Sequence, residues 1–242
     1  MWFLHSLTPF SMGLGGVPEF LNCLPTGNGG FVPLEVVDVP ERDWGSCCAD
    51  WDRTVGEALR QIPSRPDSDW NWRLIAKLLR LGRFRRPRLL QLRVGEKSLP
   101  AAMVALLERE RWFDGGGLAT FVWYLSTAPS HLLQVEVSGS LGVPKLVGRA
   151  AIDAAMVVSA TGEAGGKLWL HADPRGVDLM LWYGTIPGLT RISERQFSIL
   201  PGPPLVRRRN DGRYFAAPAS TSQWTLVDMD HLRQAFERGK ES

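Results

Sequence analysis

One stretch of this 242-residue chain decides its fold: Pro144-Lys145-Leu146-Val147-Gly148-Arg149-Ala150-Ala151-Ile152. It opens an Ala- and Val-rich run that closes at Gly165-Gly166 and is followed by Lys167-Leu168-Trp169-Leu170-His171. The pattern predicts a loop, a helix and then a buried strand. The first turn of a helix has N–H groups without intrahelical partners, so an anion such as a diphosphate can bind there. The alternative is that Gly148 only eases a turn and that the helix packs its Ala face on a sheet.

The composition is that of an ordinary globular protein, with 44% hydrophobic and 22% charged residues. The net charge of +3 is too small to imply a nucleic-acid partner by itself. Three cysteines, Cys23, Cys47 and Cys48, cannot all pair, so we expect no disulfide framework and a reducing, cytoplasmic location. The four histidines are too far apart in sequence to predict a structural zinc site.

The order of patterns predicts an irregular leader over residues 1–29 and a single domain over 30–242. The first residues are apolar but lack a basic region and are soon interrupted by Pro and Gly, which argues against a signal peptide or a membrane span. Strands are predicted at 31–39, 88–94, 101–107, 118–127, 167–172 and 193–200, although 101–107 would equally suit a helix. Helices are predicted from Asp50 or Asp52 to Gln61, from Trp70 to Leu81 with Asp67, Ser68 or Asp69 as cap, and at 177–183 and 228–238.

Three motifs together resemble one known superfamily. Lys145-x-x-Gly148-x-Ala150 is similar to the Gln/Arg-x-x-Gly-x-Gly/Ala signature of the GCN5-related N-acetyltransferases. The strand before it ends at Ala128-Pro129, and Trp182-Tyr183 with Gly188 matches the aromatic-Tyr-x-x-x-x-Gly segment that follows it in that family. The resemblance implies an α/β (α+β) fold of the acyl-CoA N-acyltransferase type. That fold has a mixed, mostly antiparallel central sheet with helices on both faces.

The resemblance also implies direct transfer of an acetyl group from acetyl-CoA (coenzyme A) to an amine of a small molecule or peptide. The residues expected at the cofactor are Leu125, Ser126, Thr127, Lys145, Leu146, Val147, Gly148, Arg149 and Ala150. Tyr183 is the expected acid for the leaving thiolate, and Trp70 and Trp72 are expected along the acceptor cleft. The general base stays open among Glu108, Glu110, Asp114, Tyr124, His131 and Glu136, with a water chain as another option. His171 follows a strand and is either catalytic or a satisfied core group.

A basic run is the second feature of interest. Eight basic residues and no acidic one occur between Trp72 and Val94: Arg73, Lys77, Arg80, Arg83, Arg85, Arg86, Arg88 and Arg93. Such a run attracts a polyanion, a membrane surface or a phosphate-bearing ligand, or is simply the solvated face of a helix and its exit loop. It defines the alternative function, a catalytically silent module of the same fold that engages a polyanion through residues 73–93. The sequence leaves the choice between monomer and homodimer open.

Overall fold

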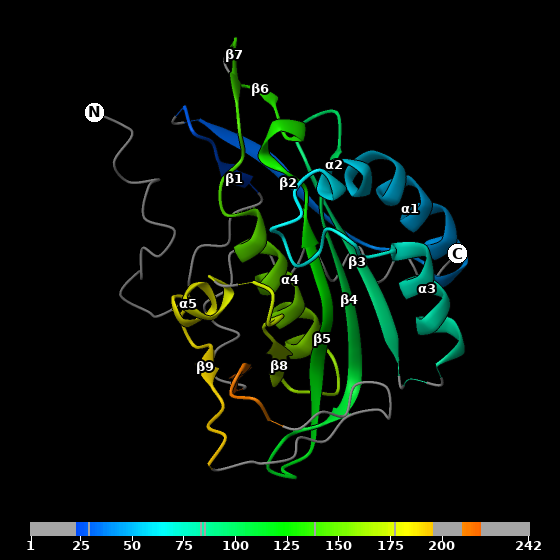
Figure 1. Ribbon diagram of the computed structural model, residues 1–242, viewed down its shortest axis with the longest axis vertical. Coiled ribbons are helices and arrows are strands. Elements are labelled where there is room, and N and C mark those ends of the chain that lie inside the picture. The colour runs from blue at the N-terminus through cyan, green and yellow to red at the C-terminus, as the bar shows by residue number, and fades with distance from the viewer. Residues whose placement is uncertain are drawn as a thin grey trace.

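An eight-stranded mixed sheet forms the centre of the computed structural model, which describes residues 23–28, 30–82, 84, 86–137, 139–176, 178–195 and 210–218 (Figure 1). The strand order is β1-β2-β3-β4-β5-β8-β10-β9, and β5 and β8 are parallel whereas the other neighbours are antiparallel. The strands are β1 (Cys23–Pro25), β2 (Phe31–Asp38), β3 (Pro87–Val94), β4 (Leu99–Arg111), β5 (Leu118–Thr127), β8 (Leu168–His171), β9 (Thr190–Arg191) and β10 (Tyr214–Ala217). The predicted mixed, mostly antiparallel sheet of an α+β protein is confirmed.

Helices connect these strands on either side of the sheet. They are η1 (Glu41–Asp43), α1 (Trp44–Trp51), the π-helical turn η2 (Asp52–Gly56), α2 (Glu57–Arg60), α3 (Trp72–Leu81), η3 (Ser130–Leu132), α4 (Val147–Thr161) and α5 (Leu179–Gly184). A small hairpin of β6 (Val135–Val137) and β7 (Ser140–Gly142) occupies the link between β5 and α4. In Figure 1, α4 lies on one side of the sheet and α1 and α3 lie on the other.

The burial of β4 shows that both faces of the sheet are covered. Residues Ala101–Leu107 are all fully buried, although successive side chains in a strand point to opposite faces. The helix α4 packs on β4, β5 and β8, while α3 packs on β3 and α1. The small side chains Ala150, Ala151, Ala154 and Ala155 are fully buried, which lets α4 approach the sheet closely. The segment 101–107 is therefore a strand, and the helical alternative is wrong.

Two predicted helix starts are wrong. The first helical segment begins at Trp44 rather than at Asp50 or Asp52, because Trp44, Cys48, Trp51 and Val55 form one buried stripe. The cap of α3 is Asn71, whose side chain accepts a hydrogen bond of 3.0 Å from the backbone N–H of Leu74. The predicted caps Asp67 and Asp69 are instead engaged by arginines.

The expected irregular leader does not extend to residue 29. Cys23–Pro25 forms the edge strand β1, with Leu24 buried, because it pairs with the start of β2. The same segment holds the loop before α4, since the N–H of Lys145 donates to the carbonyl of Pro25 over 2.7 Å. The predicted strand 193–200 is not formed at 193–195, where residues 194–195 make a turn, and its remainder lies outside the described residues, as does the predicted helix 228–238.

Three sequence expectations, on membrane spans, disulfides and metal ligands, can be compared with the described part of the chain. None of its helices combines the length and the apolar character that a membrane crossing requires. Cys23, Cys47 and Cys48 are free thiols, and burial raises the pKa of Cys47 to about 11 and that of Cys48 to about 12. Within the same residues, His, Cys, Asp and Glu side chains form no group that could hold a metal ion.

Candidate functional site

The sheet opens between its two parallel strands. β5 and β8 pair only at Thr120–Leu168, Phe121–Trp169 and Val122–Leu170. At the next residue β5 has a bulge: Val122 and Tyr124 pair with consecutive residues of β4, so Trp123 has no partner there. A bulge bends its strand and frees backbone groups from the ladder. From this point on β5 is paired with β4 alone, and its other edge faces a cleft.

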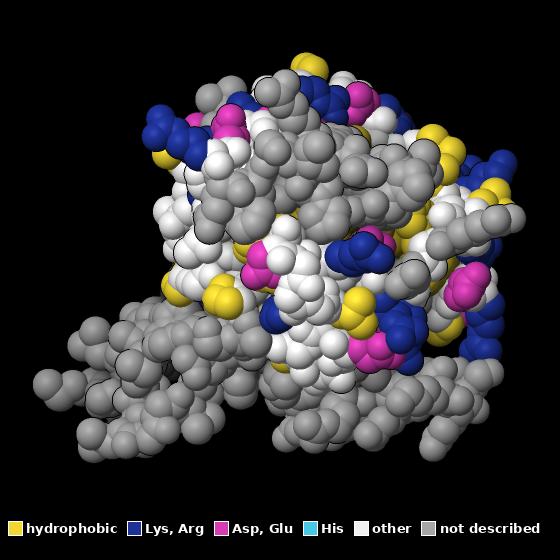
Figure 2. Space-filling view, turned by 90° about the horizontal axis from the view of Figure 1, so that it is seen from below, with side chains coloured by type: hydrophobic (Ala, Val, Ile, Leu, Met, Phe, Trp, Pro, Cys, Tyr) yellow, Lys and Arg dark blue, Asp and Glu magenta, His cyan; other side chains and the backbone are white. Residues whose placement is uncertain are grey.

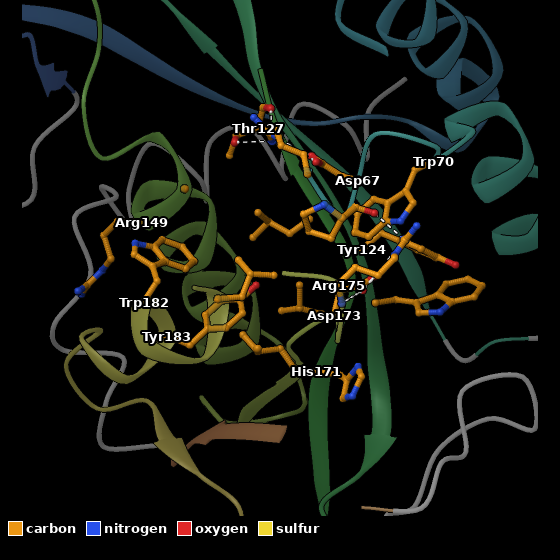
Figure 3. Close-up of a pocket in the computed structure, with 18 of the residues that line it drawn as sticks. Asp67, Trp70, Tyr124, Thr127, Arg149, His171, Asp173, Arg175, Trp182 and Tyr183 are labelled. Carbon is orange, nitrogen blue, oxygen red and sulfur yellow. Dashed lines mark hydrogen bonds and ion pairs between the residues drawn. The ribbon is translucent and has the colours of Figure 1, made fainter. Parts of the chain in front are cut away.

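The cleft has a volume of about 750 Å³, within the usual range for a small-molecule site. Its walls are the open part of β5, the end of β8, the first turn of α4, the helix α5 and the loop between α2 and α3 (Figure 3). The polar and aromatic side chains at its surface are Arg65, Asp67, Trp70, Phe121, Trp123, Tyr124, Thr127, Arg149, His171, Asp173, Arg175, Trp182, Tyr183 and Tyr214. Segments far apart in sequence therefore meet in one cleft.

The N-terminus of α4 reaches this cleft without a side-chain cap. Leu146 precedes the helix in the left-handed region, with φ of 63°, and its apolar side chain cannot accept a hydrogen bond. At Gly148, a Cβ atom would lie 3.2 Å from the Cζ2 and Cη2 atoms of Trp182. A side chain at this position would therefore have to push the indole back by a few tenths of an ångström. The first-turn N–H groups of α4 are thus presented at the cleft beside Trp182.

Most of the residues predicted at the cofactor line the cleft. Those that do are Leu125, Thr127, Leu146, Val147, Gly148 and Arg149. Ser126 and Ala150 are fully buried and do not line it, and Lys145 is exposed outside its lining. Arg149 lies beyond Trp182, with its guanidinium directed away from Tyr183 (Figure 3). Its Nε donates to Asp153 over 2.8 Å, and this carboxylate compensates the charge expected to complement a phosphate.

Tyr183, the expected acid, lines the cleft and is almost fully buried. Its ring packs against Trp182, at 4.9 Å between centroids, and against Phe215, at 5.5 Å. Burial, with Asp67 and Asp173 nearby, raises the pKa of the phenol well above its usual value. Within the described residues the hydroxyl has no hydrogen-bond partner. The phenol therefore stays protonated at neutral pH and is able to donate into the cleft.

A buried ionic network fixes the loop between α2 and α3 to β5. Arg65 binds both carboxylate oxygens of Asp67, over 2.9 and 2.7 Å, and donates to the carbonyl of Thr127 over 2.8 Å. Ser126 donates to Asp67 over 2.6 Å. Asp67 is only 5% exposed, and these three donor groups compensate its burial. Ser126 thus supports the cleft wall through Asp67.

A second arginine joins this loop to the segment after β8. Arg175 binds both oxygens of Asp173 over 3.2 Å, pairs with Asp69 over 2.8 Å and donates to the carbonyl of Pro66. Burial alone would raise the pKa of Asp173, but the hydrogen bonds and charge of Arg175 lower it. The α2–α3 loop is therefore held from both sides of the cleft, by Arg65 toward β5 and by Arg175 toward β8.

His171 ends β8 and has a carboxylate partner. Its Nε2 lies 3.0 Å from Oδ2 of Asp211, and its ring packs against Tyr214 at 4.5 Å between centroids. Burial would raise the pKa of Asp211, but the hydrogen bond from His171 and backbone hydrogen bonds lower it. The imidazole side chain is 11% exposed and lines the cleft. His171 therefore lines the cleft and is not part of the fully buried core.

Among the predicted base candidates, Tyr124 is the one that lines the cleft. Glu108 is buried beside Arg88, at 3.3 Å, and Asp114 accepts from Gly116 in the turn after β4. Glu110, His131 and Glu136 also lie outside the lining. Of the two tryptophans expected along the acceptor cleft, Trp70 does line the cleft and packs on Tyr124, with 4.8 Å between ring centroids. Trp72 instead is buried in the core, where it packs against Trp51.

The described members of the basic run mostly have partners. Arg80 donates to the carbonyl of Glu41, Arg86 pairs with Glu163, Arg88 pairs with Glu108 and Asp38, and Arg93 donates to Gln91. Arg73 and Lys77 are exposed on α3, while Arg83 and Arg85 lie outside the described residues. On the face in Figure 2, Lys and Arg side chains lie in separate groups, several of them beside Asp or Glu. Of the described residues of the run, Arg86 and Arg88 are therefore ion-paired with acidic side chains.

Comparison with known proteins adds no assignment. No protein-family model matches the chain, and no curated protein matches it significantly.

Proposed function

We propose that this protein is an acetyl-CoA-dependent N-acetyltransferase with the fold of the GCN5-related N-acetyltransferases. It transfers the acetyl group directly to an amine in a ternary complex. The observation that carries the proposal is the opening of the sheet at Trp123, because the freed edge of β5, the first turn of α4 and Tyr183 all border the resulting cleft. A thioester donor needs each of these three elements.

The residues present fit a phosphate-bearing acyl carrier. The N–H groups of Val147, Gly148 and Arg149 have no intrahelical acceptor, and the α4 helix dipole favours an anion beside them. Lys145 adds a positive charge close to this turn. The side chain of Arg149 stays bound to Asp153, so the phosphates are held mainly by backbone N–H groups. The open edge of β5 around Leu125 is left for the extended arm of the carrier and its thioester carbonyl, while the carbonyl of Thr127 is bound by Arg65.

In the reaction, the acceptor nitrogen attacks the thioester carbonyl carbon, a C–N bond forms and the C–S bond breaks. Backbone N–H groups of β5 beyond the bulge stabilise the developing charge on the carbonyl oxygen. Tyr183 donates its phenolic proton to the leaving sulfur, a role that its protonated, buried hydroxyl suits. The acceptor enters past Trp70 and Tyr124 on the opposite wall of the cleft.

The test is cofactor binding followed by turnover. Acetyl-CoA at about a hundred times its dissociation constant stabilises a native protein by about 2.7 kcal/mol. For a chain of this length that corresponds to a rise in Tm of roughly 5–10 °C. Polyamines, aminoglycosides, amino acids and peptide N-termini are then screened as acceptors, with release of free thiol as the signal. Absence of a thermal shift at millimolar acetyl-CoA refutes the proposal.

A pair of glycine variants tests where the cofactor binds. In Gly148→Asp, a carboxylate enters the first turn of α4, and its Cβ meets Trp182, so acetyl-CoA binding is expected to be lost. The control is Gly45→Asp in the first turn of α1, where a Cβ would have its nearest neighbour 4.0 Å away, at Arg80, outside the cleft lining. This control has the same added charge and is expected to bind acetyl-CoA normally.

The catalytically silent module remains the second candidate, favoured by the compensation of Arg149 by Asp153. It predicts no acetyl-CoA binding and salt-sensitive binding to DNA, RNA or acidic vesicles, because each phosphate contact releases counterions. The ion pairs of Arg86 with Glu163 and of Arg88 with Glu108 reduce the charge available for such binding, whereas Arg80 and Arg93 donate to neutral oxygens. For that reason we favour the transferase.

A further inference from the structure

We propose that His171 and Asp211 form a catalytic dyad in which Nδ1 of the imidazole accepts the proton of the acceptor amine. This role rests on the transferase function proposed above. It goes beyond that function by naming the general base.

The first argument is the tautomer. An ionised carboxylate only accepts hydrogen bonds, so Nε2 of His171 must carry the proton that lies 3.0 Å from Asp211. In the neutral imidazole, Nδ1 then has a lone pair. Among the described residues, Nδ1 has no hydrogen-bond partner. The ring is therefore held in the form that accepts a proton, and Asp211 stabilises the imidazolium that results.

The second argument is the state of the other ionisable groups that line the cleft. Arg65 is paired with Asp67, and Arg175 is paired with Asp173. Arg149 is paired with Asp153, which lies on its own helix. Burial keeps Tyr183 protonated through its raised pKa, so that group is a donor. His171 remains as the cleft residue with an acceptor nitrogen and a partner for its positive charge.

The third argument is position. His171 is the first residue of β8 after its pairing with β5 ends, so it stands where the two strands separate. It lines the same cleft as Tyr183, the proposed acid, and Tyr124, which is part of the acceptor wall.

The proposed proton transfer balances. The acceptor nitrogen forms the amide bond and its proton passes to Nδ1 of His171, while the sulfur leaves with the C–S electron pair and takes the proton of Tyr183. Imidazolium and phenolate then return to their starting forms by exchange of one proton with solvent.

The test compares His171→Gln with His131→Gln. His131 lies in η3, is exposed and does not line the cleft, so its variant controls for loss of an imidazole. The probes are 2-phenylethylamine, chosen because Trp70 and Tyr124 form an aromatic wall, and spermidine, each with acetyl-CoA. His171→Gln should lower kcat/KM roughly 10²- to 10⁴-fold near neutral pH, as removal of a general base does, and should leave the thermal shift with acetyl-CoA unchanged. His131→Gln should match the wild type in both measurements.

The pH profile separates a catalytic from a structural role. The titratable and charged groups that contact the imidazole or share its cleft are, among the described residues, Asp211, Tyr214, Asp173, Arg175, Tyr124, Tyr183, Arg65, Asp67 and Arg149. Asp211→Asn should lower kcat/KM and move the acidic limb of the profile to lower pH, because the imidazolium loses its counter-charge. A merely structural histidine would change activity without moving this limb.

The outcomes distinguish the two proposals. If the wild type transfers acetyl groups and His171→Gln keeps full kcat/KM, the dyad is refuted and the transferase stands. If the wild type shows no thermal shift with acetyl-CoA and releases no thiol with either amine, the transferase is refuted and the dyad with it. If kcat/KM of His171→Gln falls but the limb stays in place in Asp211→Asn, the carboxylate has no part in the proton transfer and the dyad is likewise refuted.

Discussion

Replacing Asp67 by Asn tests whether the cleft wall depends on one buried carboxylate. Asp67 is 5% exposed and accepts from Arg65 through two nitrogens and from Ser126 through its hydroxyl. Breaking a buried ion pair by removing one partner costs about 3–5 kcal/mol. The side chain of Arg65 is 28% exposed, so water partly replaces the lost contact. We therefore expect a loss of about 3 kcal/mol, the lower end of this range.

The control for this prediction is two residues away. Asp69 also pairs with an arginine, Arg175, over 2.8 Å, but the two side chains are 66% and 49% exposed. Exposed ion pairs contribute about 0–1 kcal/mol, so Asp69→Asn should change stability by less than about 1 kcal/mol. Urea unfolding followed by tryptophan fluorescence measures both variants. If the unfolding free energy falls by about 2–3 kcal/mol per molar urea, the urea concentration at the unfolding midpoint should be roughly 1 M lower in Asp67→Asn than in the wild type. Equal losses in the two variants would contradict the buried network as the anchor of the loop.

The remaining predictions concern catalysis and pH. Tyr183→Phe should lower kcat by roughly 10²-fold and leave acetyl-CoA affinity unchanged, because the ring still packs on Phe215, and steady-state kinetics with a calorimetric titration would check both. Burial, opposed by Arg88, raises the pKa of Glu108 above 4.5, so the folded state binds this proton more readily than the unfolded state. The stability due to this difference is present below pH 4.5 and is lost as the pH rises through the folded pKa. The difference in unfolding free energy between Glu108→Gln and the wild type should therefore shift in favour of the variant when the pH is raised from 4.5 to about 7.5. Urea unfolding of both proteins at the two pH values measures this shift.

Local patterns predicted most of the sheet. The apolar run of β5 was placed at 118–127, and the loop, helix and strand around Gly148 were found in that order. These elements are encoded by neighbours in sequence, through alternation, helical spacing and glycine breaks. The start of α1 was missed because its buried stripe includes Trp44, which precedes a glycine and lacks a strong N-cap signal. Edge strand β1 was missed because three residues carry too short a pattern, and its pairing with β2 supplies the stability.

The residues of the candidate site that belong to a sequence motif were predicted, whereas those brought together only by tertiary contacts were not. Gly148, Thr127 and Tyr183 were found through motif resemblance and do line one cleft. Nothing in the sequence near His171 points to Asp211, 40 residues away, because a hydrogen bond between a strand end and a distant loop has no local pattern. The spacing of Asp173 and Arg175, two residues apart, is a local sequence signal for the ion pair that these side chains form.

The bulge at Trp123 connects these separate parts into one argument about function. If β5 continued to pair with β8 beyond Val122, the edge of β5 would be filled by ladder hydrogen bonds and no ligand could add to it. Because pairing stops there, His171 at the end of β8 and Tyr124 on β5 line one cleft instead of adjoining strands of a closed sheet. The two arginines then hold the α2–α3 loop at the cleft, since Arg65 of the loop binds the carbonyl of Thr127 on β5, and Arg175, after β8, binds Asp69 and the carbonyl of Pro66 in the loop. Asp67 also accepts from Ser126 on β5, so its carboxylate is one of the contacts that join the loop to the sheet, and its loss should change the geometry of the cleft as well as the stability of the fold.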